Sequence, residues 1–333
     1  MPLRVAVLGG GSFGTTVASL ACRNAPAVLW ARRRDLVDEI NREHRNERYL
    51  PGFGLPAALR ATDSLEEAVG AADVVVMGVP SHGFRAVLEE LAPWLRPWVP
   101  LVSLAKGLEQ GSHLRMTQVI RELLPDHRAG ALTGPNLAKE IMAGFAAASV
   151  IAVDDAMVAS QLQAVFQSGV FRVYTNDDVV GCELGGALKN VIAIATGMGD
   201  GLGVGDNTRA AVITRGLAEL TRLGVAMGGR EPTFSGLAGM GDLVATCISP
   251  QSRNRRVGEE LGRGRKLEEI LAGMNQVAEG VKTAKVVMEL AERHGVDMPI
   301  AREVYGVLYE GHSPRDAYRG LTRRPARAES DPA

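Results

Sequence analysis

A single lysine lies within a long apolar, glycine-rich run in the middle of the chain. Lys189 is the only charged residue between Glu183 and Asp200. An ammonium group in such surroundings is poorly solvated, which favours its neutral form, and lysines of this kind often act as acids or bases. The alternative is a lysine whose stem packs on a helix while its head reaches water. The segment alone leaves both interpretations open.

A glycine-rich turn near the start of the chain predicts a dinucleotide site. Gly9, Gly11 and Gly14 fit the pattern G-x-G-x-x-G, directly after an apolar run and before a helical segment. The first glycine permits a tight turn, the second lets a pyrophosphate approach the backbone, and the third allows close packing of helix on strand. The helix start directs free N–H groups at the phosphates. The alternative is an ordinary glycine turn in an unrelated α/β fold.

The end of the second predicted strand bears on the choice of cofactor. An NAD site usually has an acidic residue about 20 residues after the glycine motif, where it binds the ribose 2′-hydroxyl. Here Arg32, Arg33 and Arg34 come first, and Asp35 follows them. Arginine at this point suits a 2′-phosphate, so NADP is favoured and NAD stays open. The alternative is that the arginines simply begin an exposed helix.

Polar residues after two later strand-like runs are candidates for ligand contacts. Lys106 follows one run, and the turn 133–136 follows another. Ligands of open α/β sheets bind beyond the carboxyl ends of the strands. Gly134 and Asn136 offer an N–H and an amide there, although Gly-Pro-Asn is equally an ordinary turn.

A basic cluster in the C-terminal half predicts an anion site. Ser252 is placed to cap a helix whose first turn carries Arg253 and two further arginines. Cations there oppose the helix dipole, and a bound phosphate would remove that conflict, whereas a solvated basic face is the alternative. Asp242 follows the glycine-rich segment 236–241, and we expect it to hold Lys189 or to bind a substrate hydroxyl.

The elements that must position these residues fall into two halves. Short runs rich in Val, Ile and Leu alternate with amphipathic segments as far as residue 182, and only helical periodicity follows. We therefore predict an α/β Rossmann-type domain with a mainly parallel sheet over 1–182, an all-α domain over 183–322 and a flexible tail over 323–333. Glycine-rich loops are expected at 197–205 and 236–241. The predicted strands are 3–8, 27–30, 73–79, 99–104, 130–132, 149–153 and 171–174.

Composition narrows the classes of function. The 333 residues include 37 basic and 38 acidic ones, a balance that argues against nucleic-acid and membrane partners. Three scattered cysteines indicate neither a disulfide framework nor a zinc site, and no metal is expected. No apolar run is expected to span a membrane, and the N-terminal run is too short for a secretory signal. We predict a cytoplasmic protein with a small-molecule substrate, and a homodimer is left open.

Taken together, the motifs resemble the nicotinamide-dependent glycerol-3-phosphate dehydrogenases, most closely the bacterial NAD(P)+-dependent form. The central blocks are long and specific, among them Glu-Leu-Gly-Gly-Ala-Leu-Lys-Asn around Lys189. One position departs from the bacterial pattern, which commonly reads Gly-Pro-Ser where this chain has Asn136. The matching blocks are 9–15, 49–52, 79–82, 105–107, 134–136, 183–190, 200–210, 239–243 and 252–255.

This resemblance implies reversible reduction of dihydroxyacetone phosphate to sn-glycerol 3-phosphate with NAD(P)H, supplying glycerophospholipid synthesis. It implies that Lys189 is the proton donor and acceptor. The implied cofactor contacts are Gly9, Gly11, Ser12, Phe13, Gly14, Arg32, Arg33, Lys106, Ala138, Arg253, Val277 and Glu279. The implied substrate contacts are Lys106, Gly134, Asn136, Lys189, Asp242, Ser252, Arg253 and Asn254.

Two other functions compete with this interpretation. One is a different two-domain dehydrogenase that acts on a hydroxy acid or sugar acid, and a requirement for a phosphorylated ketone would distinguish it. The other is a redox sensor that binds NAD(P)H without turnover, but the sequence shows no nucleic-acid module to support it.

Overall fold

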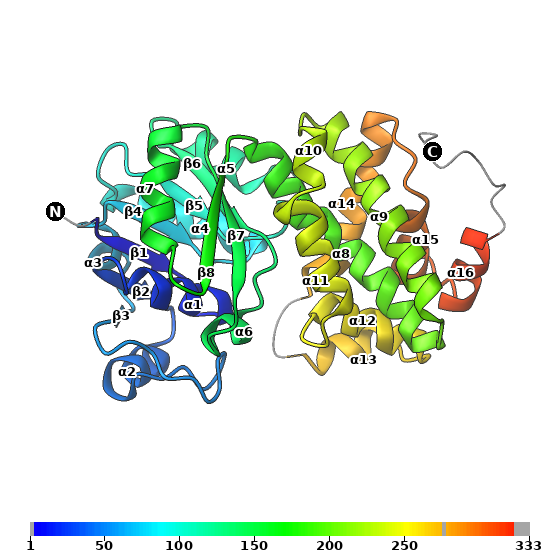
Figure 1. Ribbon diagram of the computed structural model, residues 1–333, viewed down its shortest axis with the longest axis horizontal. Helices are drawn as coiled ribbons and strands as arrows, with labels where there is room; N and C mark the ends of the chain where they lie inside the picture. The colour runs from blue at the N-terminus through cyan, green and yellow to red at the C-terminus, as the bar shows by residue number, and fades with distance from the viewer. Residues whose placement is uncertain (1–2, 275–277, 323–333) are drawn as a thin grey trace. The chain divides into compact units, whose positions relative to one another are not determined.

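The computed structural model describes residues 3–274 and 278–322, and the chain divides into two compact units. Unit 1 comprises Met1–Glu109 and Leu114–Val179, and unit 2 comprises Gln110–His113 and Val180–Ala333. The sheet belongs to unit 1, whereas the described part of unit 2 is helical (Figure 1). The predicted boundary after residue 182 stays a prediction, and the predicted tail 323–333 lies outside the described residues.

Unit 1 is built on an eight-stranded sheet with the strand order β3-β2-β1-β4-β5-β6-β7-β8. All neighbouring strands are parallel except β6 and β7, which are antiparallel. This arrangement confirms the predicted mainly parallel sheet. The strands are β1 (Val5–Leu8), β2 (Ala27–Trp30), β3 (Arg60–Thr62), β4 (Val74–Met77), β5 (Leu101–Ser103), β6 (Ala129–Thr133), β7 (Ala147–Ala152) and β8 (Phe171–Asn176).

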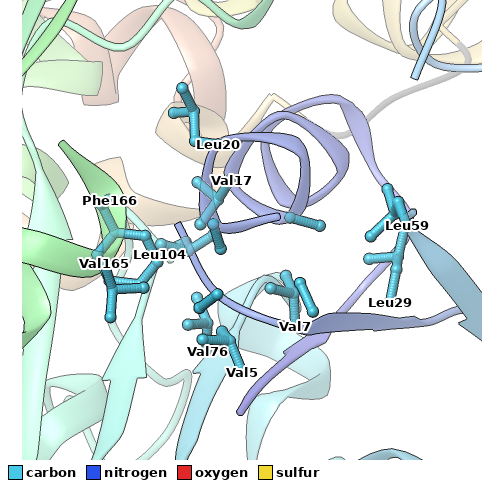
Figure 2. Packing of buried hydrophobic residues seen from close by; sticks show 14 of the residues in the cluster. Val5, Val7, Val17, Leu20, Leu29, Leu59, Val76, Leu104, Val165 and Phe166 are labelled. Atoms are coloured by element: carbon cyan, nitrogen blue, oxygen red, sulfur yellow. The ribbon is translucent and has the colours of Figure 1, made fainter. Parts of the chain in front are cut away.

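Helices cover both faces of this sheet, which explains why β1 and β4 are apolar at every position. Val5 and Val7 of β1 belong to one core cluster with Phe166, part of which is seen in Figure 2. Leu8 points to the other face and packs in a second cluster with Phe84. The helices of unit 1 are α1 (Ser12–Ala21), α2 (Arg34–Glu43), α3 (Leu65–Val69), α4 (Ser81–Leu91), η1 (Ala92–Trp94), α5 (Met116–Leu123), α6 (Ala138–Met142) and α7 (Ala156–Phe166).

The long helix α8 (Val179–Leu202) is a buried helix of the core. It has 24 residues, and 94% of its most apolar window is buried. Our expectation that no run reaches the length of a membrane span was therefore wrong, but the burial is that of a core helix. The other helices of unit 2 are α9 (Asp206–Ala226), α10 (Glu231–Phe234), η2 (Leu237–Gly241), α11 (Asp242–Ile248), α12 (Arg253–Gly262), α13 (Leu267–Ala272), α14 (Glu279–His294), α15 (Pro299–Tyr309) and α16 (Pro314–Thr322).

The predicted loop 197–205 is helical over most of its length, because α8 continues to residue 202. Its glycines serve close packing. A Cβ atom on Gly197 would lie 1.9 Å from the carbonyl oxygen of Arg255, and one on Gly258 would lie 2.0 Å from that of Ile194. Helices α8 and α12 therefore pack backbone against backbone, which only glycine allows.

The predicted loop 236–241 is also largely regular, since η2 forms a π-helical turn. A Cβ atom on Gly239 would lie 2.1 Å from the carbonyl oxygen of Phe234, so glycine again permits a close contact. Because α11 follows without a break, Asp242 begins a helix instead of lying in a loop. Single π-helical turns occur frequently at functional sites.

A buried carboxylate links α9 to the start of α15. Glu219 is 2% exposed and accepts hydrogen bonds from the backbone N–H groups of Ile300 (2.7 Å) and Ala301 (3.2 Å). Burial raises its pKa from 4.5 to about 7, although both N–H groups and the charge of Arg222 act in the opposite direction. The folded state therefore holds this proton at pH values where the unfolded chain has released it.

We expect Glu219 to make the protein less stable as the pH rises from about 5 to about 8, because the folded state binds the extra proton. A shift from 4.5 to about 7 corresponds to about 3 kcal/mol of unfolding free energy. Urea unfolding of Glu219→Gln across this pH range should show a flatter dependence than the parent. Glu292→Gln, at an exposed position of α14, is the control and should keep the parental slope. Equal slopes for Glu219→Gln and the parent would contradict this assignment.

Candidate active site

Lys189 lies on α8 and is buried, with 4% of its surface exposed. Its Nζ donates to Asp242 Oδ1 at 2.6 Å and also donates to Thr246 Oγ1. Asp242 is 2% exposed, so the ion pair is nearly withdrawn from water. The alternative of a lysine whose head reaches solvent is therefore wrong. A buried ammonium held by a carboxylate and a hydroxyl has a fixed position, which a proton donor requires.

Helix α11 supplies two hydrogen-bond partners of this lysine from one face. Asp242 and Thr246 are four residues apart, and the Thr246 hydroxyl donates to the carbonyl oxygen of Asp242 at 2.7 Å. Cys247 is the next residue, and burial raises the pKa of its thiol to about 11. The thiol therefore stays protonated near neutral pH and is a poor nucleophile, which leaves acid–base chemistry to the lysine.

A second polar cluster begins at the residue after the lysine. The side chain of Asn254, on α12, donates to Asn190 Oδ1 at 2.8 Å and accepts from the backbone N–H of Gly280 at 3.0 Å. A Cβ atom on Gly280 would lie 2.7 Å from the carbonyl oxygen of Asn190, so α14 begins close against α8. Glu279, an expected cofactor contact, is the first residue of α14. These contacts place Asn254 and Glu279 near the lysine helix.

The predicted anion site lies at the first turn of α12. Ser252 accepts a hydrogen bond from the backbone N–H of Arg255 at 3.2 Å, which confirms the predicted helix cap. Arg253 is the first helical residue and is exposed. Arg255, two residues further on, is paired with Asp200 at 2.7 Å. Arg253 and the helix start can therefore both approach an anion.

In unit 1, the glycine turn after β1 has the shape that a dinucleotide requires. Gly9 has a φ of +125°, and a Cβ atom there would lie 2.6 Å from the carbonyl oxygen of Gly78. A Cβ on Gly14 would lie 2.0 Å from the carbonyl oxygen of Gly9, whereas one on Gly11 would meet nothing within 4 Å. No side chain caps α1, so its first N–H groups face this open position. The turn thus fits a pyrophosphate.

The other expected cofactor residues of the first half lie around this turn and after β2. Ser12 donates to the carbonyl oxygen of Tyr49 at 2.7 Å and opens α1 together with the half-buried Phe13. Arg33 is paired with Asp35, and this hydrogen bond lowers the pKa of the carboxyl. Arg32 is exposed and has no hydrogen bond or ion pair within residues 3–274 and 278–322.

Two further candidates meet beyond the carboxyl ends of β5 and β6. The Nζ of Lys106 donates to the carbonyl oxygen of Gly134 at 2.7 Å. Asn136 lies two residues further along, and its amide donates to Ser149 Oγ at 3.1 Å. Ala138 is the half-buried first residue of α6. The structure therefore brings Lys106 to the turn that holds Gly134 and Asn136, a contact that the sequence did not reveal.

The remaining expectations concern Val277 and metals. Val277 lies outside the described residues. Within the described ranges, no group of three or more His, Cys, Asp or Glu residues is placed to hold a metal ion. Sequence reasoning missed Thr246, Asn190 and Ser149 as partners of the candidates. The spacing of four residues from Asp242 was the one available signal for Thr246.

Comparisons with known proteins assign the chain to a family. The models described as NAD-dependent glycerol-3-phosphate dehydrogenase N-terminus and C-terminus match residues 4–159 and 178–319. An NAD(P)+ glycerol-3-phosphate dehydrogenase of Sphingopyxis alaskensis is 61% identical over 332 residues, which cover 100% of both chains. The chain belongs to the NAD-dependent glycerol-3-phosphate dehydrogenase family. This result confirms the predicted family.

Other members of the family agree over almost the whole length. An NAD(P)+ glycerol-3-phosphate dehydrogenase of Mycobacterium avium is 60% identical over 319 residues, covering 96% of this chain and 94% of the relative. The crystal structure of glycerol-3-phosphate dehydrogenase from Coxiella burnetii has a TM-score of 0.93 at 37% identity, covering 97% of this chain and 99% of that one. Family membership confirms the fold class and makes the chain an oxidoreductase of NAD(P).

Proposed function

We propose that the protein reversibly reduces dihydroxyacetone phosphate to sn-glycerol 3-phosphate with NAD(P)H, preferring NADPH, and that Lys189 is its proton donor and acceptor. The observation that carries this proposal is the buried contact of Lys189 with Asp242 and Thr246. A basic helix start on α12 and a glycine turn after β1 supply the two anion sites that a phosphorylated substrate and a dinucleotide need.

The buried lysine accounts for the proton in this reaction. When bound, the nicotinamide supplies a hydride to the ketone carbon, or accepts one from the alcohol in reverse. Negative charge then grows on the ketone oxygen, and the ammonium of Lys189 stabilises it and transfers a proton to it. In reverse, neutral Lys189 removes the hydroxyl proton. Asp242 holds the lysine side chain in one position throughout, so little reorganisation is needed during the transfer.

Residues on α12 are proposed to bind the substrate away from the reacting carbon. Arg253 provides a planar fork that matches two phosphate oxygens, and Ser252 and Asn254 flank it on the same helix start. Asn254 is fixed by Asn190 and by the Gly280 N–H, so this side of the substrate site is rigid. Lys106, Gly134 and Asn136 are proposed to contribute further substrate contacts from unit 1. Binding energy from such contacts supplies orientation.

The cofactor is proposed to lie on the glycine turn of unit 1. Arg32 and Arg33 are placed after β2 for a 2′-phosphate. Because Arg33 is already paired with Asp35, Arg32 should contribute more of the discrimination. The other proposed cofactor contacts are Gly9, Gly11, Ser12, Phe13, Gly14, Lys106, Ala138, Arg253, Val277 and Glu279.

We expect Arg32→Ala to raise the KM for NADPH about tenfold and to leave that for NADH nearly unchanged, since only NADPH carries the 2′-phosphate. The double variant Arg32→Ala/Arg33→Ala should lose more. Steady-state kinetics with both cofactors measures the effect. Arg34→Ala is the matched control, because Arg34 is paired with Asp63 at 3.2 Å. Equal losses for the two cofactors would rule out recognition of the 2′-phosphate.

The reaction itself is tested by following NADPH absorbance with dihydroxyacetone phosphate, then with unphosphorylated dihydroxyacetone and with hydroxy acids. Oxidation that requires the phosphorylated ketone supports the proposal, and equal use of unphosphorylated dihydroxyacetone contradicts it. A supply role in glycerophospholipid synthesis and a cytoplasmic location follow from this activity as parts of the proposal. The oligomeric state, including the homodimer left open by the sequence, requires light scattering.

A further inference from the structure

Two polar side chains and one backbone carbonyl group are joined by hydrogen bonds at the carboxyl end of β6. Ser149 is fully buried on β7, next to Thr133 of β6. The Ser149 hydroxyl donates to the carbonyl oxygen of Thr133 at 2.7 Å. The side-chain amide of Asn136 donates to the same Ser149 oxygen at 3.1 Å. The direction of these two hydrogen bonds determines which end of the Asn136 amide faces Ser149.

A hydroxyl carries one proton, and the proton of Ser149 is committed to Thr133. Towards Asn136 the Ser149 oxygen can therefore only accept. Of the two ends of the Asn136 amide, only the NH2 group can donate, so it must face Ser149. An inverted amide would bring two acceptor oxygens together. Ser149 thus selects one of the two orientations of Asn136.

This orientation leaves the amide oxygen of Asn136 as the end that faces away from Ser149. Asn136 Oδ1 is buried and has no hydrogen-bond partner within the described residues. A buried acceptor without a partner is costly, and a bound donor would remove that cost. Lys106 lies close by through its hydrogen bond to Gly134, so the oxygen lies among the proposed ligand contacts of unit 1.

We propose that Ser149 is a positioning residue that fixes the Asn136 amide so that its oxygen accepts a hydrogen bond from a neutral donor of the bound ligand. This inference rests on the proposed function, which supplies two ligands with such donors. One source is the free hydroxyl of the substrate, and the other is a carboxamide N–H or ribose hydroxyl of the cofactor. Ionised phosphate oxygens and the ketone oxygen have no proton to give, so Asn136 discriminates against them at this point.

A double-mutant cycle between the two residues tests the proposal. In the parent, Ser149→Ala frees the amide to rotate and should weaken ligand binding about fivefold, the size of one hydrogen bond. In the Asn136→Ser background there is no amide to orient, so the same change should have little further effect on binding. Two readouts distinguish the donors: the KM for dihydroxyacetone phosphate reports the substrate hydroxyl, and the dissociation constant of NADPH, from its fluorescence, reports the cofactor.

Melting temperatures of all four proteins separate positioning from stability. Loss of the Thr133 contact should lower the melting temperature similarly in both backgrounds, because that contact does not involve Asn136. Ser149→Thr keeps the hydroxyl and should restore binding. Equal effects of Ser149→Ala on binding in both backgrounds, or no effect on either constant, would overturn the proposal. If the parent does not reduce dihydroxyacetone phosphate, the proposed function fails, and the NADPH constants still test whether Ser149 positions Asn136 for the cofactor.

Discussion

Lys189→Ala is expected to lower kcat by about 10²- to 10⁴-fold while NADPH still binds, because the variant lacks the group that exchanges a proton with the substrate oxygen. The contacts of Lys189 with Asp242 and Thr246 hold the ammonium in one place, so water is a poor substitute. Pre-steady-state kinetics and NADPH fluorescence measure the two effects separately.

Removal of the lysine alone also leaves the buried Asp242 without its cation, which costs about 3–5 kcal/mol of folding free energy. The double variant Lys189→Met/Asp242→Asn removes both charges and should recover the melting temperature without recovering turnover. Lys285→Ala, at an exposed position of α14, is the matched control and should keep kcat within about twofold. Near-parental kcat in Lys189→Ala would show that another group transfers the proton.

Strands β1 and β4 of unit 1 were predictable because both are buried along their whole length and are therefore apolar at every position. The glycine turn was also predictable, because neighbouring backbone leaves no room for a Cβ atom at Gly9 or Gly14 and only glycine fits at either position. Strand β3 was not predicted, because Arg60–Thr62 is short and contains no Val, Ile or Leu. It forms at the sheet edge by pairing with β2, a tertiary contact that local sequence does not reveal.

The glycines of unit 2 misled the prediction for a definite physical reason. In a single sequence, Gly197 is indistinguishable from a glycine that bends a loop, although it lies inside α8. Its role depends on the backbone of α12 at Arg255, which is 58 residues further along the chain and outside any local window. The same limit applies to the candidate site. Residue type identified Lys189 and Asp242, but the hydrogen bonds to Thr246 depend on how α8 packs against α11.

Arg253→Ala is expected to raise the KM for dihydroxyacetone phosphate by about 10- to 100-fold, because a guanidinium forms charge-assisted hydrogen bonds with phosphate. Arg253 is the first residue of α12, where a cation opposes the helix dipole unless an anion lies between them. A bound phosphate relieves this conflict, so phosphate should raise the melting temperature of the parent more than that of Arg253→Ala. Thermal unfolding with and without inorganic phosphate measures this difference.

Arg256→Ala is the matched control for this prediction. Arg256 lies in the same first turn and is exposed, so its removal changes the net charge of the helix start equally. If the positive charge of the helix start only attracted the phosphate at a distance, the KM would rise in both variants. Direct contact between Arg253 and the phosphate would raise the KM only in Arg253→Ala. Arg253→Lys should recover little, since a lysine keeps the charge and loses the planar fork. If the KM for NADPH rises instead of that for the phosphorylated ketone, Arg253 serves the cofactor, and the substrate phosphate must be bound elsewhere.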